Sequence, residues 1–220
     1  YQSIPTVLHS QQLKIIIDQV DDAKVVVAGT SGLAAEPGES AAFSISAQNV
    51  GNSAAQYSVE CISQNRWQIM LGNSNSSTLD FEPLDISAYL SMPVRIFVPP
   101  VVGGLPSVGD TDSVTCYVTS FTDPSLNYSE SVVISVLEKE EFKSNLLDNG
   151  VPVGTNLLTR DVLVDSGEEK YLEYEIINSG NSILDMEVSI QPSNPSWILK
   201  VFSETENDSR KVSVVIQPGD

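Results

Sequence analysis

The sequence is poor in histidine and cysteine and in the basic residues on which nucleic-acid binding depends. It has one histidine (His9), two cysteines, and 11 Lys and Arg against 29 Asp and Glu in 220 residues, for a net charge of −18. Because affinity for phosphate backbones and anionic membranes rests on Lys and Arg, we expect no nucleic-acid partner and no docking on such membranes. No apolar run approaches about 18 residues, so we expect no direct membrane insertion by this segment.

Motifs that carry catalytic chemistry are also lacking. The Gly-Thr-Ser-Gly stretch at 29–32 has neither the spacing of a nucleophile elbow nor the lysine of a phosphate loop. Two cysteines without a nearby histidine do not make a zinc site, and His9 lies outside the repeats described below. We therefore predict that the chain is not an enzyme and that no cofactor is required.

Calcium is the one metal ion that the acidic composition suggests as a ligand. Asp110 and Asp112 lie near one expected strand start, and Asp80, Glu82 and Asp85 lie near another. Calcium takes clustered oxygen ligands, but the sequence has no EF-hand loop and no glycine-aspartate repeat. A solvated acidic surface is the favoured interpretation, with a calcium site as the alternative.

Both ends of the sequence resemble cut points. The chain begins at Tyr1 without Met and without the profile of a signal peptide, and it stops at Asp220 directly after a strand-like run. We interpret it as a window from a longer protein.

An internal repeat organises the chain. Residues 49–53 (NVGNS) match residues 178–182 (NSGNS) at an offset of 129, and Trp67 matches Trp197 with one residue inserted. Alternating apolar residues lie between these anchors in both copies, which is typical of strands with one buried face. We further match the apolar run at 94–98 to the run at 212–216.

Seven short strands are expected in the first copy, separated by turns rich in Gly, Pro, Asn and Ser. Their ranges are 23–28, 40–49, 55–62, 67–71, 86–98, 112–121 and 129–137. This count and spacing predict an all-β protein of tandem immunoglobulin-like antiparallel β-sandwiches, the second one truncated.

Four segments follow from this pattern. Residues 1–22 are the tail of a preceding domain or a linker strand, 23–137 are a complete sandwich, 138–156 are a linker, and 157–220 are an incomplete second sandwich. Within the linker, 138–149 is either a short helix or extended chain. The apolar stretch at 13–17 is either the last strand of an earlier domain or a strand that packs beside 23–28 or caps the second copy.

Five motifs resemble those of a known group of modules. They are residues 37–40 (PGES), 43–45 (FSI), 49–52 (NVGN), 67–69 (WQI) and 94–99 (VRIFVP). Together they resemble the NPCBM-associated and CARDB-type immunoglobulin-like repeats of archaeal and bacterial surface proteins. The resemblance implies a tandem module of a secreted enzyme, an adhesin or an S-layer-like protein, and it brings no catalytic motif.

The two cysteines fall on the inner faces of strands expected to be neighbours in one sheet. Cys61 and Cys116 therefore form either a disulfide, which requires an oxidising compartment, or two buried thiols. Trp67 and Trp197 begin inward-facing runs, so packing in the core is favoured over stacking on sugar rings.

Three triplets fit the pattern of a glycosylation acceptor, at Asn75, Asn127 and Asn207, all in expected loops. We predict a non-catalytic spacer or adhesion module, located outside the cell or at its surface. Its expected partners are neighbouring repeats of the same chain and a cell-surface protein or glycan. The alternative is a carbohydrate-binding accessory module of a secreted hydrolase or protease, which would need exposed coplanar aromatics such as Tyr89, Tyr117 and Tyr128.

Overall fold

The chain is built of β-strands throughout the part that the structure describes. A computed structural model describes residues 12–148, 150–155, 163–194, 196, 198–201 and 210–220. All fourteen elements within these residues are strands. None of the described residues belongs to a helix with the length and apolar character needed to cross a bilayer.

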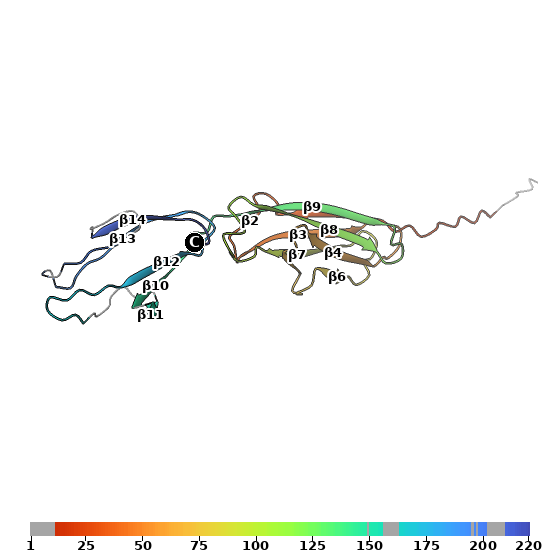
Figure 1. Cartoon of the computed structure of the whole chain (residues 1–220). Coiled ribbons are helices and arrows are strands. Elements are labelled where there is room, and N and C mark those ends of the chain that lie inside the picture. Colours follow the sequence, from red (N-terminus) through yellow and green to blue (C-terminus); the bar gives the residue numbers. More distant parts are fainter. Residues whose placement is uncertain (1–11, 149, 156–162, 195, 197, 202–209) are drawn as a thin grey trace, which may run out of the picture.

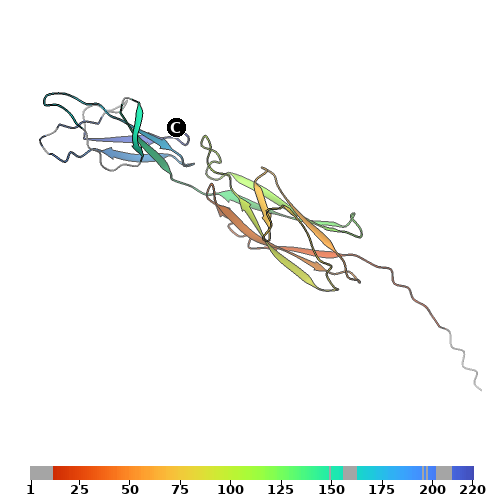
Figure 2. The ribbon, with the colours of Figure 1, turned by 90° about the horizontal axis from the view of Figure 1, so that it is seen from below.

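Nine strands form the first domain and five follow it along the chain. The strands are β1 (Ala23–Ala28), β2 (Ala34–Ala35), β3 (Ser40–Asn49), β4 (Tyr57–Ser63), β5 (Gln68–Leu71), β6 (Thr78–Asp80), β7 (Tyr89–Phe97), β8 (Thr111–Ser120), β9 (Asn127–Val136), β10 (Phe142–Asp148), β11 (Val151–Thr155), β12 (Glu173–Asn178), β13 (Leu184–Ser189) and β14 (Lys211–Ile216). The groups β1–β9 and β10–β14 lie end to end in both views (Figures 1 and 2).

The first domain is an immunoglobulin-like sandwich of two sheets. One sheet has the order β1-β3-β7-β5 and the other has the order β2-β9-β8-β4-β6. All pairings are antiparallel except the short parallel pairing of β2 with β9. The seven strands expected in this domain are all present, with bounds that differ by at most three residues. The additional strands β2 and β6 are only two and three residues long.

The core of the first domain lies between these sheets. The period of two puts alternate side chains of β3, β4, β7 and β8 inside, where they form one buried cluster. Phe43, Ile45, Val59, Val114 and Val118 are each at most 3% exposed, as the sequence predicts. Trp67 is half-buried and packs against the cluster, so its indole is partly a core group.

The segment expected as a linker or short helix is a strand. β10 pairs with β12, from Phe142 opposite Asn178 to Leu147 opposite Glu173, and it also pairs with β11. The spacing of Phe142 and Leu146 suggested a helix, but pairing with two neighbours decides the local structure here. β10 and β11 therefore belong to the second domain, and only residues 138–141 connect the domains.

The second domain has two separate sheets within the described residues, β11-β10-β12 and β13-β14. The Asn178 side chain donates from Nδ2 to the carbonyl of Ile216 (3.0 Å), as Asn49 donates to the carbonyl of Leu84 (2.9 Å). β14 thus corresponds to the segment that runs from β6 to Leu84. The expected match of residues 212–216 to residues 94–98 is therefore wrong. The error arose because both runs have the same apolar alternation, and only the hydrogen bonds distinguish them.

By these correspondences β10, β12, β13 and β14 repeat β1, β3, β4 and the β6 segment. The described residues of the second domain contain no counterpart of β7, β8 or β9. Their only buried apolar side chains are Leu184 and Val212. Tyr174, whose place in the alternating apolar pattern of the second copy predicts burial, is 46% exposed. Leu172 and Val188, also expected in this core, are half-buried, and Trp197 lies outside the described residues.

The segment that leads into the first domain is extended and exposed. Residues 12–20 form no strand, and Leu13, Ile15 and Ile17 are 73–84% exposed. The expectation that this segment packs beside β1 is wrong. Instead, only its last residues contact the domain, through the bonds described next.

Candidate functional site at the domain junction

The repeated Asn-x-Gly-Asn motif holds the chain that enters each domain. In the first copy, Asn52 accepts from the Val20 amide at Oδ1 (2.8 Å) and donates from Nδ2 to the Asp18 carbonyl (2.9 Å). Its own amide donates to the Val20 carbonyl (3.1 Å), and the Val50 amide donates to the Asp22 carbonyl (3.0 Å). We call this set of bonds the clasp of the first domain.

The second copy has the same clasp, on the chain between the domains. Asn181 accepts from the Lys139 amide at Oδ1 (2.7 Å) and donates from Nδ2 to the Leu137 carbonyl (3.1 Å). The Asn181 amide donates to the Lys139 carbonyl (3.1 Å), and the Ser179 amide donates to the Glu141 carbonyl (2.9 Å). The bonds therefore recur one for one, on entering segments that differ in sequence.

A glycine at the centre of each clasp permits the close approach of the entering chain. A Cβ on Gly51 would lie 2.3 Å from the Val20 carbonyl oxygen, and a Cβ on Gly180 would lie 2.2 Å from that of Lys139. Both distances are far below van der Waals contact with a backbone atom. No other residue fits these positions unless the entering chain moves.

The second clasp also reaches into the first domain. Asn181 Nδ2 donates to the carbonyl of Pro106 (3.2 Å), in the loop between β7 and β8. In the same loop, Gly104 lies against the turn of Pro218 and Gly219, so closely that a Cβ on Gly104 would be 2.9 Å from the Pro218 carbonyl oxygen. Asn181 is consequently only 4% exposed. One amide group therefore bonds both the linker and a loop of the first domain.

The Lys139 side chain adds a polar contact across the junction. Its Nζ donates to the carbonyl of Pro37 (3.3 Å) in the first domain and forms an ion pair with Glu141 (2.9 Å). Both partners of the ion pair are partly exposed, so its contribution to stability is small.

A cluster of tyrosine and aspartate side chains supports the first clasp. The single hydroxyl hydrogen of Tyr57 is shared between the Asp22 carbonyl (2.9 Å) and Asn49 Oδ1 (3.2 Å), and Tyr128 Oη donates to Asp22 Oδ1 (2.5 Å). Burial, and after it the charge of Asp21, raises the pKa of Tyr57 to about 12. The hydrogen bond to Asp22 raises the pKa of Tyr128. The second copy has Met186 at the position of Tyr57, so its clasp lacks this support.

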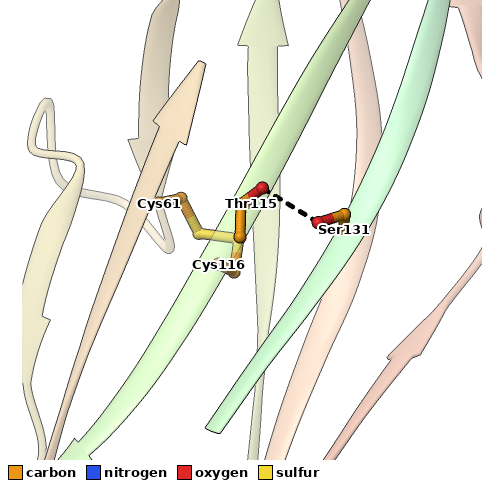
Figure 3. The surroundings of a disulfide bond; sticks show 4 residues. All are labelled: Cys61, Thr115, Cys116 and Ser131. Carbon is orange, nitrogen blue, oxygen red and sulfur yellow. Dashed lines mark hydrogen bonds between the residues drawn. A yellow bond between two sulfur atoms is a disulfide. The ribbon is translucent and has the colours of Figure 1, made fainter. Parts of the chain in front are cut away.

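The two cysteines are joined across β4 and β8. Cys61 and Cys116 are register partners in the five-stranded sheet, with Cα atoms 4.0 Å apart, and their sulfur atoms are bonded (Figure 3). Both residues are at most 1% exposed, and the outward-facing Thr115 bonds Ser131 on β9 (2.9 Å). The disulfide therefore lies within one sheet and faces the core.

Two of the carboxylates considered for calcium, Asp110 and Asp112, have structural partners. Asp112 is 1% exposed and accepts from Ser63 Oγ (2.6 Å) and the Asn65 amide (2.9 Å), while Asp110 accepts from the Ser107 amide (2.8 Å). These bonds hold turns at the strand ends. No group of three or more His, Cys, Asp or Glu residues suited to a metal occurs among the described residues.

The aromatic and glycosylation candidates lie apart from one another. Tyr89 is exposed on β7 of one sheet, whereas Tyr117 and Tyr128 lie on β8 and β9 of the other, and Tyr128 packs against the core. These three side chains do not assemble a platform for a sugar ring. Asn75 is exposed in the β5–β6 loop, and Asn127 is exposed at the first residue of β9 rather than in a loop. Asn207 and His9 lie outside the described residues.

Sequence reasoning found the clasp residues but not their role. The motifs at 49–53 and 178–182 served as anchors of the repeat and were interpreted as turns. The sequence did contain a signal for a role beyond a turn. A turn needs Gly or Asn at one position, whereas both motifs have two asparagines and one glycine in the same order.

Comparison with known proteins gives similarity of fold only. The sequence matches no known protein family, and no curated protein matches it. Among solved structures, the CARDB domain of a Pyrococcus furiosus protein in complex with di-metal ions is 9% identical, with a TM-score of 0.36 over 59% of this chain and 100% of that one. A C-terminal fragment of the major pilin GBS80 of Streptococcus agalactiae is 9% identical, with a TM-score of 0.32 over 91% of this chain and 92% of that one.

A FixG-related protein from Vibrio parahaemolyticus is 12% identical, with a TM-score of 0.37 over 53% of this chain and 98% of that one. The TM-scores of these three structures lie between 0.32 and 0.37.

Proposed function

We propose that the chain is a non-catalytic spacer segment of an extracellular or cell-surface protein. In this role, tandem immunoglobulin-like domains hold another part of the protein at a fixed distance and direction. The observation that carries the proposal is the bond from Asn181 to Pro106, because it joins the clasp of one domain to a loop of the domain before it (3.2 Å). A flexible tether would need no such bond.

Two further features support this role and its location. The disulfide between Cys61 and Cys116 suits an oxidising compartment outside the cytoplasm. The net charge of −18 favours solubility and disfavours adhesion of neighbouring copies at close range.

Residual dipolar couplings of the whole chain test the spacer role, because they report the alignment of each domain separately. We expect both domains to share one alignment tensor. Asn181→Ala removes the bonds to Leu137 and Pro106, so the second domain should acquire its own, weaker alignment.

Asn52→Ala is the matched control, because it removes the same clasp bonds at a place where they hold only residues 18–20. It should leave the angle between the domains unchanged. Independent tumbling of the two domains in the unmodified chain would contradict the spacer role.

A further inference from the structure

We call the end of the first domain that carries Asn52 its leading end. The surface at this end is equivalent to the surface that the second domain buries against the first. Asn52 corresponds to Asn181, and the turn at Ser87 corresponds to the turn at Gly219. Ser87 has a φ of 67° and donates to the Asn49 carbonyl, as Gly219, with a φ of 87°, donates to the Asn178 carbonyl.

These equivalent surfaces differ in what covers them. Asn181 is 4% exposed, because the loop of residues 102–106 lies over it, whereas Asn52 is exposed. On the turns that carry Asn52 and Ser87, the apolar residues Val50 and Ile86 are 46% and 56% exposed. The second amide hydrogen of Asn181 Nδ2 bonds Pro106, and Asn52 has no corresponding bond within the described residues.

The segment before the first clasp carries a second, independent signal. Leu13, Ile15 and Ile17 each precede by 119 positions a buried residue of β9, namely Val132, Ile134 and Val136. The same offset relates the clasped residues, Asp18 to Leu137, Val20 to Lys139 and Asp22 to Glu141. The three apolar side chains are 73–84% exposed, although the β9 residues at these positions are at most 3% exposed.

We propose that the leading end of the first domain is a docking surface for another immunoglobulin-like domain of the same polypeptide, whose last strand is residues 13–17. In that domain Leu13, Ile15 and Ile17 face the core as Val132, Ile134 and Val136 do. A loop equivalent to residues 102–106 then covers Asn52 and accepts its second amide hydrogen.

A second copy of this chain is a poorer occupant for the docking surface. The only described loop of the required kind, residues 102–106, is already covered by the copy's own second domain, through Asn181 and Gly219. The proposed strand at 13–17 is also joined to the first clasp by the same number of residues as β9 is to the second. The inference goes beyond the spacer role, because it concerns which surface is covered and by what, and it stands whether or not the joint is rigid.

A chimaera tests the proposal. Residues 23–131 are placed directly before Leu13 of the chain, so that residues 13–18 take the place of 132–137 in a duplicated leading domain. We expect hydrogen exchange of the amides at 13–17 to slow by about 100-fold or more relative to the unmodified chain. The leading domain should unfold cooperatively.

Two substitutions at adjacent positions sharpen the test. Ile15→Asp places a charge at the position of the buried Ile134 and should abolish the protection of 13–17. Ile16→Asp is the matched control, since Ile16 corresponds to the outward-facing Ser135, and it should retain the protection. If both variants behave alike, the proposed strand is wrong.

The control for a failure to fold is a tandem chain whose leading domain keeps its own residues 132–137. If this tandem folds while the chimaera does not, or if residues 13–17 exchange freely in a folded chimaera, the proposal is overturned. Cross-saturation from a leading domain to Asn52 Nδ2 hydrogens should appear in the chimaera and be absent from the unmodified chain. Its absence from the chimaera would overturn the docking surface.

Discussion

The two domains share the chain-entry clasp and differ in almost everything that stabilises a core. The first has a single cluster of buried side chains between two sheets, and the second has two buried apolar side chains among its described residues, Leu184 and Val212. Nevertheless, the hydrogen bonds of Asn52 and Asn181 agree to within a few tenths of an ångström. The difference teaches that the clasp is encoded locally, by two asparagines and a glycine, and does not depend on the number of buried core residues.

The largest difference between the two domains should be in their rates of amide hydrogen exchange. The hydrogen-bonded amides of β12 should exchange about 10⁴-fold or more faster than those of β3, because a thin core opens at a lower free-energy cost. Exchange of the whole chain measured by mass spectrometry or NMR provides the comparison. Equal protection of the two strands would mean that the second domain is stabilised by interactions outside the described residues.

Removal of the disulfide should have the next largest effect, and only on the first domain. The bond between Cys61 and Cys116 closes a loop with a sequence separation of 55, so its loss should reduce the free energy of unfolding by about 4 kcal/mol. Thermal unfolding of Cys61→Ala/Cys116→Ala, or of the reduced protein, measures this. The second domain has Ile190 at the position of Cys61 and should unfold unchanged.

Thr115→Val is the control for the disulfide variant. It removes the outward-facing bond to Ser131 beside the disulfide and should cost about 1 kcal/mol or less. A cost similar to that of the double cysteine variant would show that the sheet, rather than the disulfide, is the sensitive element.

The sequence predicted the first domain well because its signals are local and redundant. Alternation in β3, β4 and β8 defines the buried face, and the expected strand order placed the strands of Cys61 and Cys116 side by side, as the structure has them. Prediction failed where one pattern fits two structures. The spacing of Phe142 and Leu146 fits a helix or a strand, and the apolar run of β14 fits the β6 segment or β7 equally well. The clasp was missed because it joins Asn52 to residues more than thirty positions away.

Substitution of either clasp glycine should lower stability by the same amount, but only one of the two substitutions should change the angle between the domains. Gly51→Ala and Gly180→Ala each place a Cβ against a carbonyl oxygen of the entering chain, so each should cost about 3 kcal/mol. Only Gly180→Ala should also change the angle between the domains, measured by small-angle scattering or residual dipolar couplings. Gly32→Asn is the control, because Gly32 has open space around it and a φ of 65° that asparagine tolerates.

High pH should weaken the first domain through Tyr57, which has no counterpart in the second domain. The pKa of Tyr57 is raised to about 12 in the folded protein, from about 10 in the unfolded chain. Folding therefore favours the protonated phenol, and this contribution is fully present below pH 10. As the pH rises from about 10 to about 12, the unfolded chain loses its proton first, and about 2 kcal/mol of stability should be lost.

Urea denaturation between pH 8 and 12 measures this loss, followed by the fluorescence of Trp67 in a chain that carries Trp197→Phe. Tyr57→Phe lowers the stability at pH 8 because Asp22 and Asn49 lose a hydrogen-bond donor, but it should flatten the dependence above pH 10. Tyr128→Phe is the matched comparison: the pKa of Tyr128 is also raised, yet its side chain is half-buried, so the variant should flatten the curve less. If Tyr57→Phe leaves the slope unchanged, the buried phenol is not the group through which alkali acts, and the tyrosine–aspartate cluster supports the clasp by packing alone.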